Sequence, residues 1–263
     1  MSALSDYAEN KIVDHVLGTA AWTMPTGIYV ALHTAAPEED ASPTNEVGAG
    51  WYARKQAATG WNAADTVTPA NGATNNGAVT WDAVTGASVT VTHVSLWDAV
   101  SGGQMLWYKA LAASKLFGVG SVPTIPDVGL NVTAGGAFSN YLIPKIIDHL
   151  LRTTPFSSPA SVYLAMADAD LTAANLTVNE ISGGSYARQL ITFDTGVGGA
   201  AGNALEEDFG TASANLGTIS HWGLYNAATV GDLLIFGAWN TPSAVDNGDI
   251  YKVLDDTLTI NAL

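Results

Sequence analysis

Apolar residues recur at helical spacing near the start of each half of the chain. In residues 5–17 they fall on one side of a helix, and the same pattern returns in residues 139–151. Ser5 is a suitable N-terminal cap, and Gly18 is a typical stop signal. Pro144 lies near the end of the first turn of the second segment, where a helix tolerates proline. The pattern predicts one short helix in each half.

Short strand-like runs fill most of the remaining sequence. Residues 27–32 and 161–166 are apolar at nearly every position, which indicates strands buried on both faces. Residues 186–193 alternate between apolar and polar side chains, as a half-buried strand does. Further runs lie at residues 78–81, 87–96, 104–111, 219–225, 233–238, 250–253 and 257–260. Many short strands after a single helix predict a mainly β fold made of β-sandwich, jelly-roll-like domains.

The two halves of the chain repeat one another. Residues 5–54 align on residues 139–188 without a gap, and the C-terminal parts match after a few extra positions within residues 62–78. Residues found in both halves include Ser5 and Ser139, Asp14 and Asp148, Glu46 and Glu180, Tyr52 and Tyr186, Arg54 and Arg188, and His93 and His221. Composition alone does not produce such a register. We therefore expect a tandem duplication with two domains, 1–134 and 135–263, each opened by one helix.

The composition narrows the class of protein. The 263 residues include no cysteine, which excludes disulfides and thiolate metal sites. Residues 2–17 carry acidic residues and a histidine among the apolar ones, unlike a signal peptide. No stretch approaches the ~20 apolar residues that a membrane helix needs. We expect a soluble protein.

The net charge of −15 bears on the partners of the chain. An acidic surface repels phosphate backbones and anionic lipids, so we expect no direct nucleic-acid binding and no membrane attachment. Only 13% of the residues are charged, and small neutral residues are abundant. Because long charged side chains are depleted on surfaces that become buried in assemblies, this composition favours a homo-oligomer.

Four of the five histidines recur in pairs, His15 with His149 and His93 with His221. Metal catalysis needs three converging ligands and a hydrolase needs a positioned nucleophile, so we interpret both pairs as structural. Acidic runs such as residues 206–208 do not align between the halves and lack the spacing of a calcium loop, which leaves calcium as the weaker alternative to solvated loops. We expect no catalytic residue, no cofactor and no metal.

Each half places a glutamate shortly before an arginine, Glu46 and Arg54 in the first and Glu180 and Arg188 in the second. A turn that contains glycine lies between the two residues and would bring them together. We interpret each pair as a salt bridge that closes this loop, since the fork of the arginine suits a carboxylate. An anion-binding site is the alternative.

Three tryptophans of the first half, Trp51, Trp61 and Trp81, have no secure counterpart in the second half. Aromatic rings with a polar edge are common at binding surfaces. These residues are therefore candidates for exposed contacts that are specific to the first domain, and they would suit a host glycan. Ordinary packing in the core is the alternative.

Several motifs of the second half form a combined pattern. Residues 139–151 carry Ser-Asn-Tyr-Leu and then Lys-Ile-Ile-Asp-His-Leu-Leu, residues 179–189 read Asn-Glu-Ile-Ser-Gly-Gly-Ser-Tyr-Ala-Arg-Gln, and residues 221–227 read His-Trp-Gly-Leu-Tyr-Asn-Ala. This pattern resembles a family of tailed-bacteriophage structural proteins, often labelled tail fibre or minor structural protein. The first half departs from it at residues 48–51 and in the longer loop after Arg54.

The resemblance implies a virion structural protein without enzymatic activity, assembled in the host cytoplasm and bound to other capsid or tail proteins. Two positions on the outside of the particle fit. A capsid decoration or head fibre is favoured by the compact acidic sequence without a long repetitive shaft, and a minor tail or tail-fibre protein is favoured by the family label. The alternative function is a glycan-binding adhesin that recognises the host surface.

Overall fold

The computed structural model describes residues 2–38, 44–65, 71–133, 137–152, 154–171 and 178–262. The elements of this part of the chain are β1 (Ser2–Leu4), α1 (Asp6–Val16), β2 (Tyr29–His33), β3 (Gly72–Thr74), β4 (Val79–Thr80), β5 (Val89–Trp97), β6 (Met105–Phe117), β7 (Thr124–Ile125), β8 (Asn131–Thr133), α2 (Leu142–Leu151), β9 (Val162–Ala167), β10 (Gln189–Ile191), β11 (Ala200–Gly202), β12 (Glu207–Thr211), β13 (Gly217–Tyr225), β14 (Leu233–Val245), β15 (Ile250–Val253) and β16 (Thr259–Asn261). Of the described residues, 39% are in strands and 9% in helices. These fractions confirm the mainly β, β-sandwich-like fold class with one short helix in each repeat.

The chain divides into two compact units. Unit 1 contains Met1–Glu9, Thr23–Ala134 and Pro144–Phe156, and unit 2 contains Asn10–Trp22, Gly135–Ile143 and Ser157–Leu263. Most of each unit comes from one repeat. The segments 10–22 and 144–156, however, belong to the unit that is formed mainly by the other repeat.

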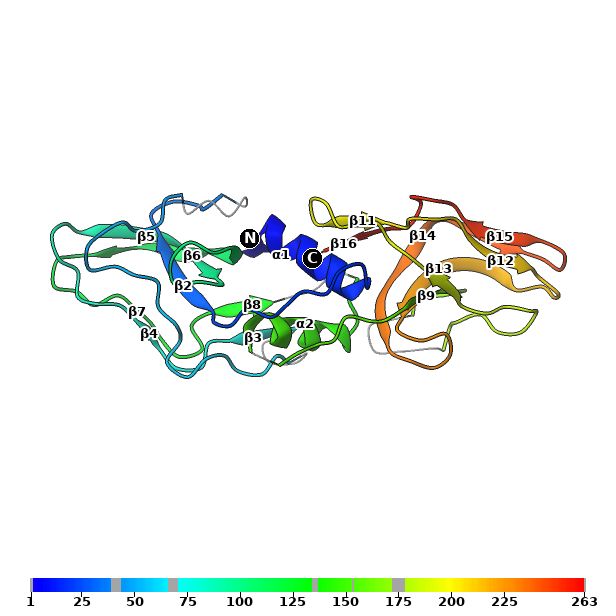
Figure 1. Cartoon of the computed structure of the whole chain (residues 1–263), viewed down its shortest axis with the longest axis horizontal. Coiled ribbons are helices and arrows are strands. Elements are labelled where there is room, and N and C mark those ends of the chain that lie inside the picture. Colours follow the sequence, from blue (N-terminus) through cyan, green and yellow to red (C-terminus); the bar gives the residue numbers. More distant parts are fainter. Residues whose placement is uncertain are drawn as a thin grey trace. The chain divides into compact units, whose positions relative to one another are not determined.

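Unit 1 is built on a four-stranded sheet with the strand order β1-β6-β5-β2 (Figure 1). Strands β2 and β5 are antiparallel, with Tyr29 opposite Trp97 and His33 opposite His93. Two smaller sheets pair β3 with β8 and β4 with β7. Four of the five residues of β2 are buried, as its continuous apolar run predicts.

Unit 2 has a four-stranded sheet of order β10-β9-β13-β14 (Figure 1). Strands β9, β13 and β14 correspond to β2, β5 and β6, while the fourth strand joins the other edge, since β10 pairs with β9 and β1 pairs with β6. Strands β9 and β13 are antiparallel, with Tyr163 opposite Tyr225 and Ala167 opposite His221. The small sheets pair β11 with β16 and β12 with β15. The long hairpins of both units carry a register shift at the same place, before His93 in unit 1 and before His221 in unit 2. Equivalent residues of the repeats therefore occupy equivalent positions.

Several strands differ from the sequence-based expectation. The pattern of residues 186–193 predicted one strand, but only Gln189–Ile191 forms β10. Strands β6 and β14 continue well beyond their predicted ends, and β1, β3, β7, β8, β11 and β12 were not predicted. Gly72–Thr74 and Ala200–Gly202 show why, because their small residues have no periodic pattern and only a distant partner strand defines them. Residues 66–70 of the extra segment in the first repeat lie outside the described residues.

A serine caps each helix and also ties it to a sheet. The hydroxyl oxygen of Ser5 accepts a hydrogen bond from the Ala8 N–H at 3.2 Å, and the hydroxyl donates to the Met105 carbonyl. Ser139 does the same in the second repeat, where it accepts from the Leu142 N–H at 3.2 Å. The cap predicted at Ser5 is present, since its oxygen satisfies an N–H of the first turn. Neither helix of the described residues is long and apolar enough to cross a membrane.

Candidate functional site

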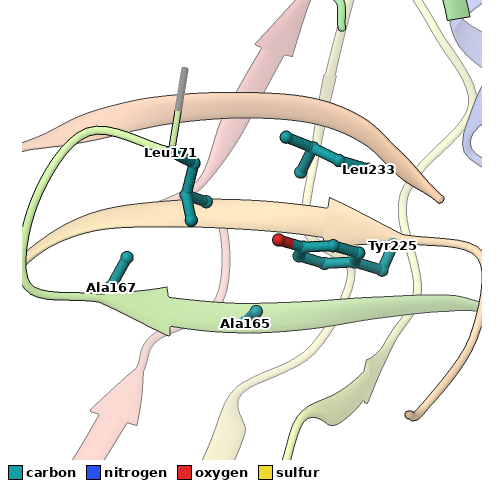
Figure 2. Packing of buried hydrophobic residues seen from close by; sticks show 5 residues of the cluster. All are labelled: Ala165, Ala167, Leu171, Tyr225 and Leu233. Atoms are coloured by element: carbon teal, nitrogen blue, oxygen red, sulfur yellow. The ribbon is translucent and has the colours of Figure 1, made fainter. Parts of the chain in front are cut away.

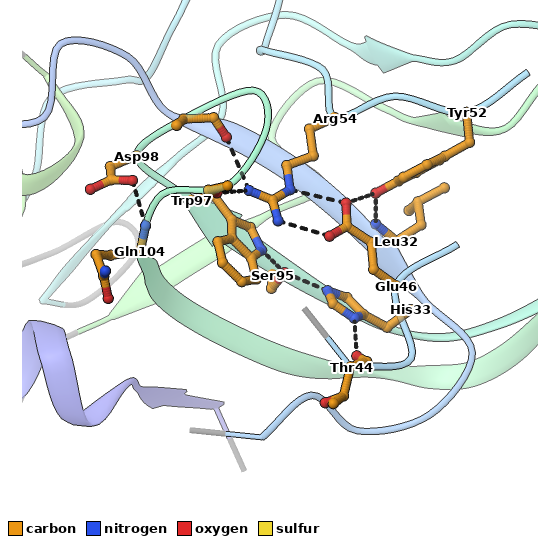
Figure 3. A network of polar contacts seen from close by, with 12 residues as sticks. Leu32, His33, Thr44, Glu46, Tyr52, Arg54, Ser95, Trp97, Asp98 and Gln104 are labelled. Atoms are coloured by element: carbon orange, nitrogen blue, oxygen red, sulfur yellow. Dashed lines mark hydrogen bonds and ion pairs between the residues drawn. The ribbon is translucent and has the colours of Figure 1, made fainter. Parts of the chain in front are cut away.

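In unit 1 the predicted pair Glu46 and Arg54 forms the centre of a buried polar cluster (Figure 3). The Arg54 Nη2 and Nε atoms donate to the two oxygens of the Glu46 carboxylate at 2.8 and 3.0 Å. Tyr52 donates its hydroxyl to the same carboxylate at 2.8 Å, and its oxygen accepts the Leu32 N–H of β2 at 3.0 Å. These three side chains, which we call the clamp, fasten the loop between Glu46 and Arg54 to the central sheet.

The other donors of Arg54 hold a second loop. Its Nη1 atom donates to the carbonyl oxygens of Ala99 and Gly102 at 3.1 and 2.7 Å, just after β5. The guanidinium carbon lies 3.6 Å from the centroid of the Trp97 ring, in cation–π geometry. An arginine has five N–H donors, and these contacts engage four of them. The clamp therefore joins two loops and leaves little of the guanidinium for an external anion.

Unit 2 contains a second clamp with the same connections. Arg188 donates from Nη2 and Nε to the Glu180 carboxylate at 2.7 Å each, and Tyr186 donates to it at 3.1 Å. The remaining Arg188 donors reach the Ala227 and Val230 carbonyls at 2.9 and 2.7 Å. The structure thus brings together both glutamate–arginine pairs singled out in the sequence.

The tyrosine of each clamp does not follow from the spacing of the glutamate–arginine pair. The repeated Tyr-Ala-Arg motif was the signal that could have identified it. Burial, with a smaller contribution from the neighbouring Glu46 carboxylate, raises the pKa of Tyr52 far above its usual value. Tyr186 is shifted upward for the same reasons, with Glu180 as the neighbour. Both hydroxyls stay protonated and keep donating to the carboxylate.

Beside the clamp of unit 1 lies a hydrogen-bonded row of His33, Ser95 and Trp97, which we call the histidine row (Figure 3). The Trp97 indole donates to the Ser95 oxygen at 2.7 Å, and Ser95 and His33 Nε2 are 2.6 Å apart. His33 Nδ1 lies 3.2 Å from the Thr44 carbonyl. Because a carbonyl oxygen only accepts, the proton is on Nδ1, and Ser95 donates to Nε2. Burial lowers the pKa of His33, in keeping with this neutral form.

A cluster of apolar residues, which we call the leucine cluster, takes this position in unit 2 (Figure 2). Its members are Ala165, Ala167, Leu171, Tyr225 and Leu233, all buried. Ala167 replaces the histidine of the row, Gly223 the serine and Tyr225 the tryptophan. A Cβ on Gly223 would lie 2.6 Å from the Leu171 Cδ1 atom. The missing side chain of the glycine therefore makes the room that Leu171 fills.

The paired histidines make local hydrogen bonds. His15 Nδ1 accepts the Trp22 N–H at 2.9 Å, and His149 Nδ1 accepts the Phe156 N–H at 3.1 Å, so each ring holds the chain that leaves its helix. His93 Nδ1 lies 2.8 Å from the hydroxyl of Thr92. Within the described ranges, no three His, Asp or Glu side chains form a group that could hold a metal ion.

A family model described as Podophage GP4 fiber I protein gp80 matches residues 3–133 and, a second time, residues 137–261. The chain belongs to this family. The predicted resemblance to a phage structural protein and the predicted duplication are thereby confirmed. Membership makes the chain a phage fibre protein, a virion component that associates with other virion components. A comparison with curated proteins gives no match.

The three tryptophans specific to the first repeat of this fibre protein are buried. Trp51, Trp61 and Trp81 are 6%, 7% and 2% exposed. Their candidate role as exposed contacts is wrong and the alternative of ordinary packing is confirmed, because the rings pack inside unit 1, as in the T-shaped contact of Trp51 with Tyr52 at 6.0 Å. The sequence could show that they lack counterparts, but it could not show how deeply they lie.

Trp61 also lines an open pocket of about 440 Å³ in unit 1 of the fibre protein. Thr26, Gln56, Thr59 and Arg152 supply polar groups to its wall. Unit 2 has an equivalent pocket of about 390 Å³, but its wall carries Leu190 and Phe193 where unit 1 has Gln56 and Thr59. The repeats therefore share the pocket and differ in its chemistry.

Proposed function

We propose that this fibre protein is a non-enzymatic accessory component on the outside of the virion. The observation that carries the proposal is the pair of identical clamps. In both repeats an arginine and a glutamate that are largely buried hold two loops on a sheet, and the guanidinium and the carboxylate satisfy each other. Such a scaffold, used twice, serves as a structural module whose surfaces face neighbours in the particle.

Its place on the particle is either the capsid, as a decoration or head fibre, or the tail, as a minor tail or tail-fibre protein. The two compact units favour the capsid slightly, and the fibre label of the family favours the tail. Immunogold labelling of intact particles distinguishes them. We expect gold on the outside of the head or along the tail, and particles without label would overturn the proposal.

Loss of host-polysaccharide viscosity on incubation with the protein would overturn its non-enzymatic part.

We further propose that residues 1–134 and 135–263 are the two duplicated domains and that the protein forms a homo-oligomer assembled in the host cytoplasm. The net charge of −15 supports partners other than nucleic acid or a membrane surface. Light scattering of the purified chain tests the oligomer, since a strictly monomeric mass at the concentration used would contradict it.

Recognition of a host glycan is the second candidate function. The polar pocket of unit 1 supports it, because Gln56 and Arg152 offer donors beside the Trp61 ring. A Cβ on Gly27 would lie 2.6 Å from the Gln56 Nε2 atom, so the glycine leaves space for this amide. Titration of host polysaccharide with tryptophan fluorescence as the readout should show saturable binding that Gln56→Ala weakens. No response at millimolar sugar would count against it, and Leu190→Ala in the equivalent pocket is the matched control.

A further inference from the structure

Unit 1 contains a second cavity, of about 190 Å³, beside strands β5 and β6. Apolar side chains form most of its wall, among them Leu32, Trp81, Val91, Val94, Leu111 and Phe117. Lys115, an exposed residue of β6, also lines the cavity, and its Nζ atom lies 5.1 Å from the centroid of the Phe117 ring in the same wall. An apolar cavity of about 150 Å³ is known to accept benzene, so this one has room for an aromatic ring.

In unit 2 a cavity of only about 10 Å³ has Met166, Phe209, Val245 and Tyr251 in its wall, the counterparts of Leu32, Trp81, Phe117 and Pro123. The pairing of β4 with β7 matches that of β12 with β15, so Tyr251 stands where unit 1 has Pro123. The Tyr251 ring packs edge-on against Phe209 at 6.0 Å, and Phe209 stacks on Tyr186 at 6.1 Å. Unit 2 thus fills this place with an aromatic ring of its own.

The long hairpin shows the same contrast. Val94 and Leu111 line the cavity of unit 1, and their counterparts in unit 2 are Trp222 and Trp239. These two tryptophan rings lie 6.2 Å apart, and Trp239 packs against the buried core of unit 2. At three wall positions, therefore, unit 1 has a smaller residue where unit 2 has an aromatic one.

Trp81, which lines the cavity, also carries a polar atom that lacks a partner. Trp81 is 2% exposed, and its indole Nε1 has no hydrogen-bond partner among the described residues. A buried donor without an acceptor is unfavourable. An oxygen carried by a ring in the cavity would satisfy it, and a phenol combines the two features.

We propose that this cavity receives a tyrosine side chain from a partner protein of the virion. The ring takes the space that Tyr251 fills in unit 2, and its hydroxyl oxygen accepts a hydrogen bond from the Trp81 indole or from the Lys115 ammonium group. The inference that the partner is a virion protein rests on the proposed function. The capacity of the cavity for a phenol does not.

The first test uses 4-methylphenol, the side-chain analogue of tyrosine, on the full-length protein. Titration should give a saturable change in tryptophan fluorescence. Pro123→Tyr and Leu111→Trp, which copy unit 2, should each weaken binding by about tenfold or more, because they fill the site. Val122→Tyr adds the same ring at a neighbouring residue that is 50% exposed, and it should leave binding unchanged. The two filling variants are independent, so one that fails to fold leaves the other as the test.

Absence of saturable binding to the unmodified protein, or undiminished binding to the folded filling variants, would overturn the proposal. Equal affinity for toluene would overturn the role of the hydroxyl.

The second test assembles particles with Leu111→Trp and measures the bound fibre protein. We expect a loss of about tenfold, as for removal of a central aromatic anchor. Undiminished incorporation would overturn the tyrosine partner while leaving the proposed virion function intact, whereas absence of the unmodified protein from particles would refute that function.

Discussion

The two units hold the same loops with the same clamp but fill the space beside it in opposite ways. Unit 1 uses the histidine row, a chain of hydrogen bonds in which each member satisfies the next (Figure 3). Unit 2 uses the leucine cluster, which has no polar side chain to satisfy other than the hydroxyl of Tyr225 (Figure 2). The fold is therefore compatible with either the histidine row or the leucine cluster, provided that the full set of side chains is present.

The comparison shows which buried groups can diverge. A hydrogen-bonded row and an apolar cluster can replace each other only as sets, because a half-changed row leaves buried donors unpaired. The clamp stayed the same in both repeats. Removing one member of an ion pair that is almost fully buried leaves the other charge without compensation.

The largest expected effect tests the clamp. Arg188→Met should lower the free energy of unfolding by about 3–5 kcal/mol, because it leaves the Glu180 carboxylate buried and unpaired. The double variant Glu180→Gln with Arg188→Met should lose less than the sum of the single changes. Denaturant unfolding measures all three, and the same series at Glu46 and Arg54 should give a similar coupling in unit 1. Strict additivity in both units would show that the pairs are not coupled.

The next effect tests the leucine cluster. Leu171→Ala should destabilise the protein by about 2–4 kcal/mol, since it removes a buried side chain and leaves a cavity. Gly223→Ser should also destabilise it, because the new Cβ would lie 2.6 Å from the Leu171 Cδ1 atom. Combining Leu171→Ala with Gly223→Ser should recover part of the loss in thermal unfolding. A double variant worse than the sum would mean that Leu171 does not fill the space freed by the glycine.

A smaller effect is expected in the histidine row. Ser95→Ala leaves both the Trp97 indole and His33 Nε2 without their partner, which should lower the free energy of unfolding by about 1–3 kcal/mol. Ser95→Gly with His33→Ala imitates unit 2 more closely, although it lacks a leucine to fill the space. Denaturant titration that shows no loss for Ser95→Ala would indicate that the row adds no stability.

The smallest effect is a pH dependence that His33 of unit 1 should contribute. Burial lowers the pKa of His33 from its ordinary value of 6.5, so the unfolded chain gains a proton at a higher pH than the folded one. Stability that is fully present above pH 6.5 is therefore lost as the pH falls below that value. Unfolding midpoints measured between about pH 8 and pH 5 should fall more steeply for the unmodified protein than for His33→Gln. If the unfolding midpoints of the two proteins fall in parallel with pH, groups other than His33 cause the pH dependence.

Much of the fold could be predicted from local pattern. The helices expected in residues 5–17 and 139–151 form as Asp6–Val16 and Leu142–Leu151, because their apolar stripe and serine cap act within a few turns. The strands expected at residues 27–32 and 161–166 form as Tyr29–His33 and Val162–Ala167. Strands Gly72–Thr74 and Asn131–Thr133, which form one of the small sheets, could not be predicted, because pairing with a distant segment creates them.

The site followed the same division. Each glutamate–arginine pair could be predicted, since its two residues are close in sequence and recur in both repeats. The contacts of Arg54 with the Ala99 and Gly102 carbonyls could not, because the loop they belong to lies far along the chain. The burial of Trp51, Trp61 and Trp81 was missed for a related reason, since exposure depends on what packs over a ring.

The sequence by itself determined that one fold is used twice, that a short helix opens each repeat and that a glutamate–arginine pair closes the same loop in both. Periodicity and repetition carry this information, and both can be read along the chain. Only the tertiary structure decided that His33 contacts Ser95 and that Leu171 fills the corresponding space in unit 2. It also decided that a cavity lined by Trp81 stays open in unit 1, whereas Tyr251 occupies the corresponding place in unit 2. These features depend on the volumes and donors of side chains from separate strands, and only folding brings those side chains together.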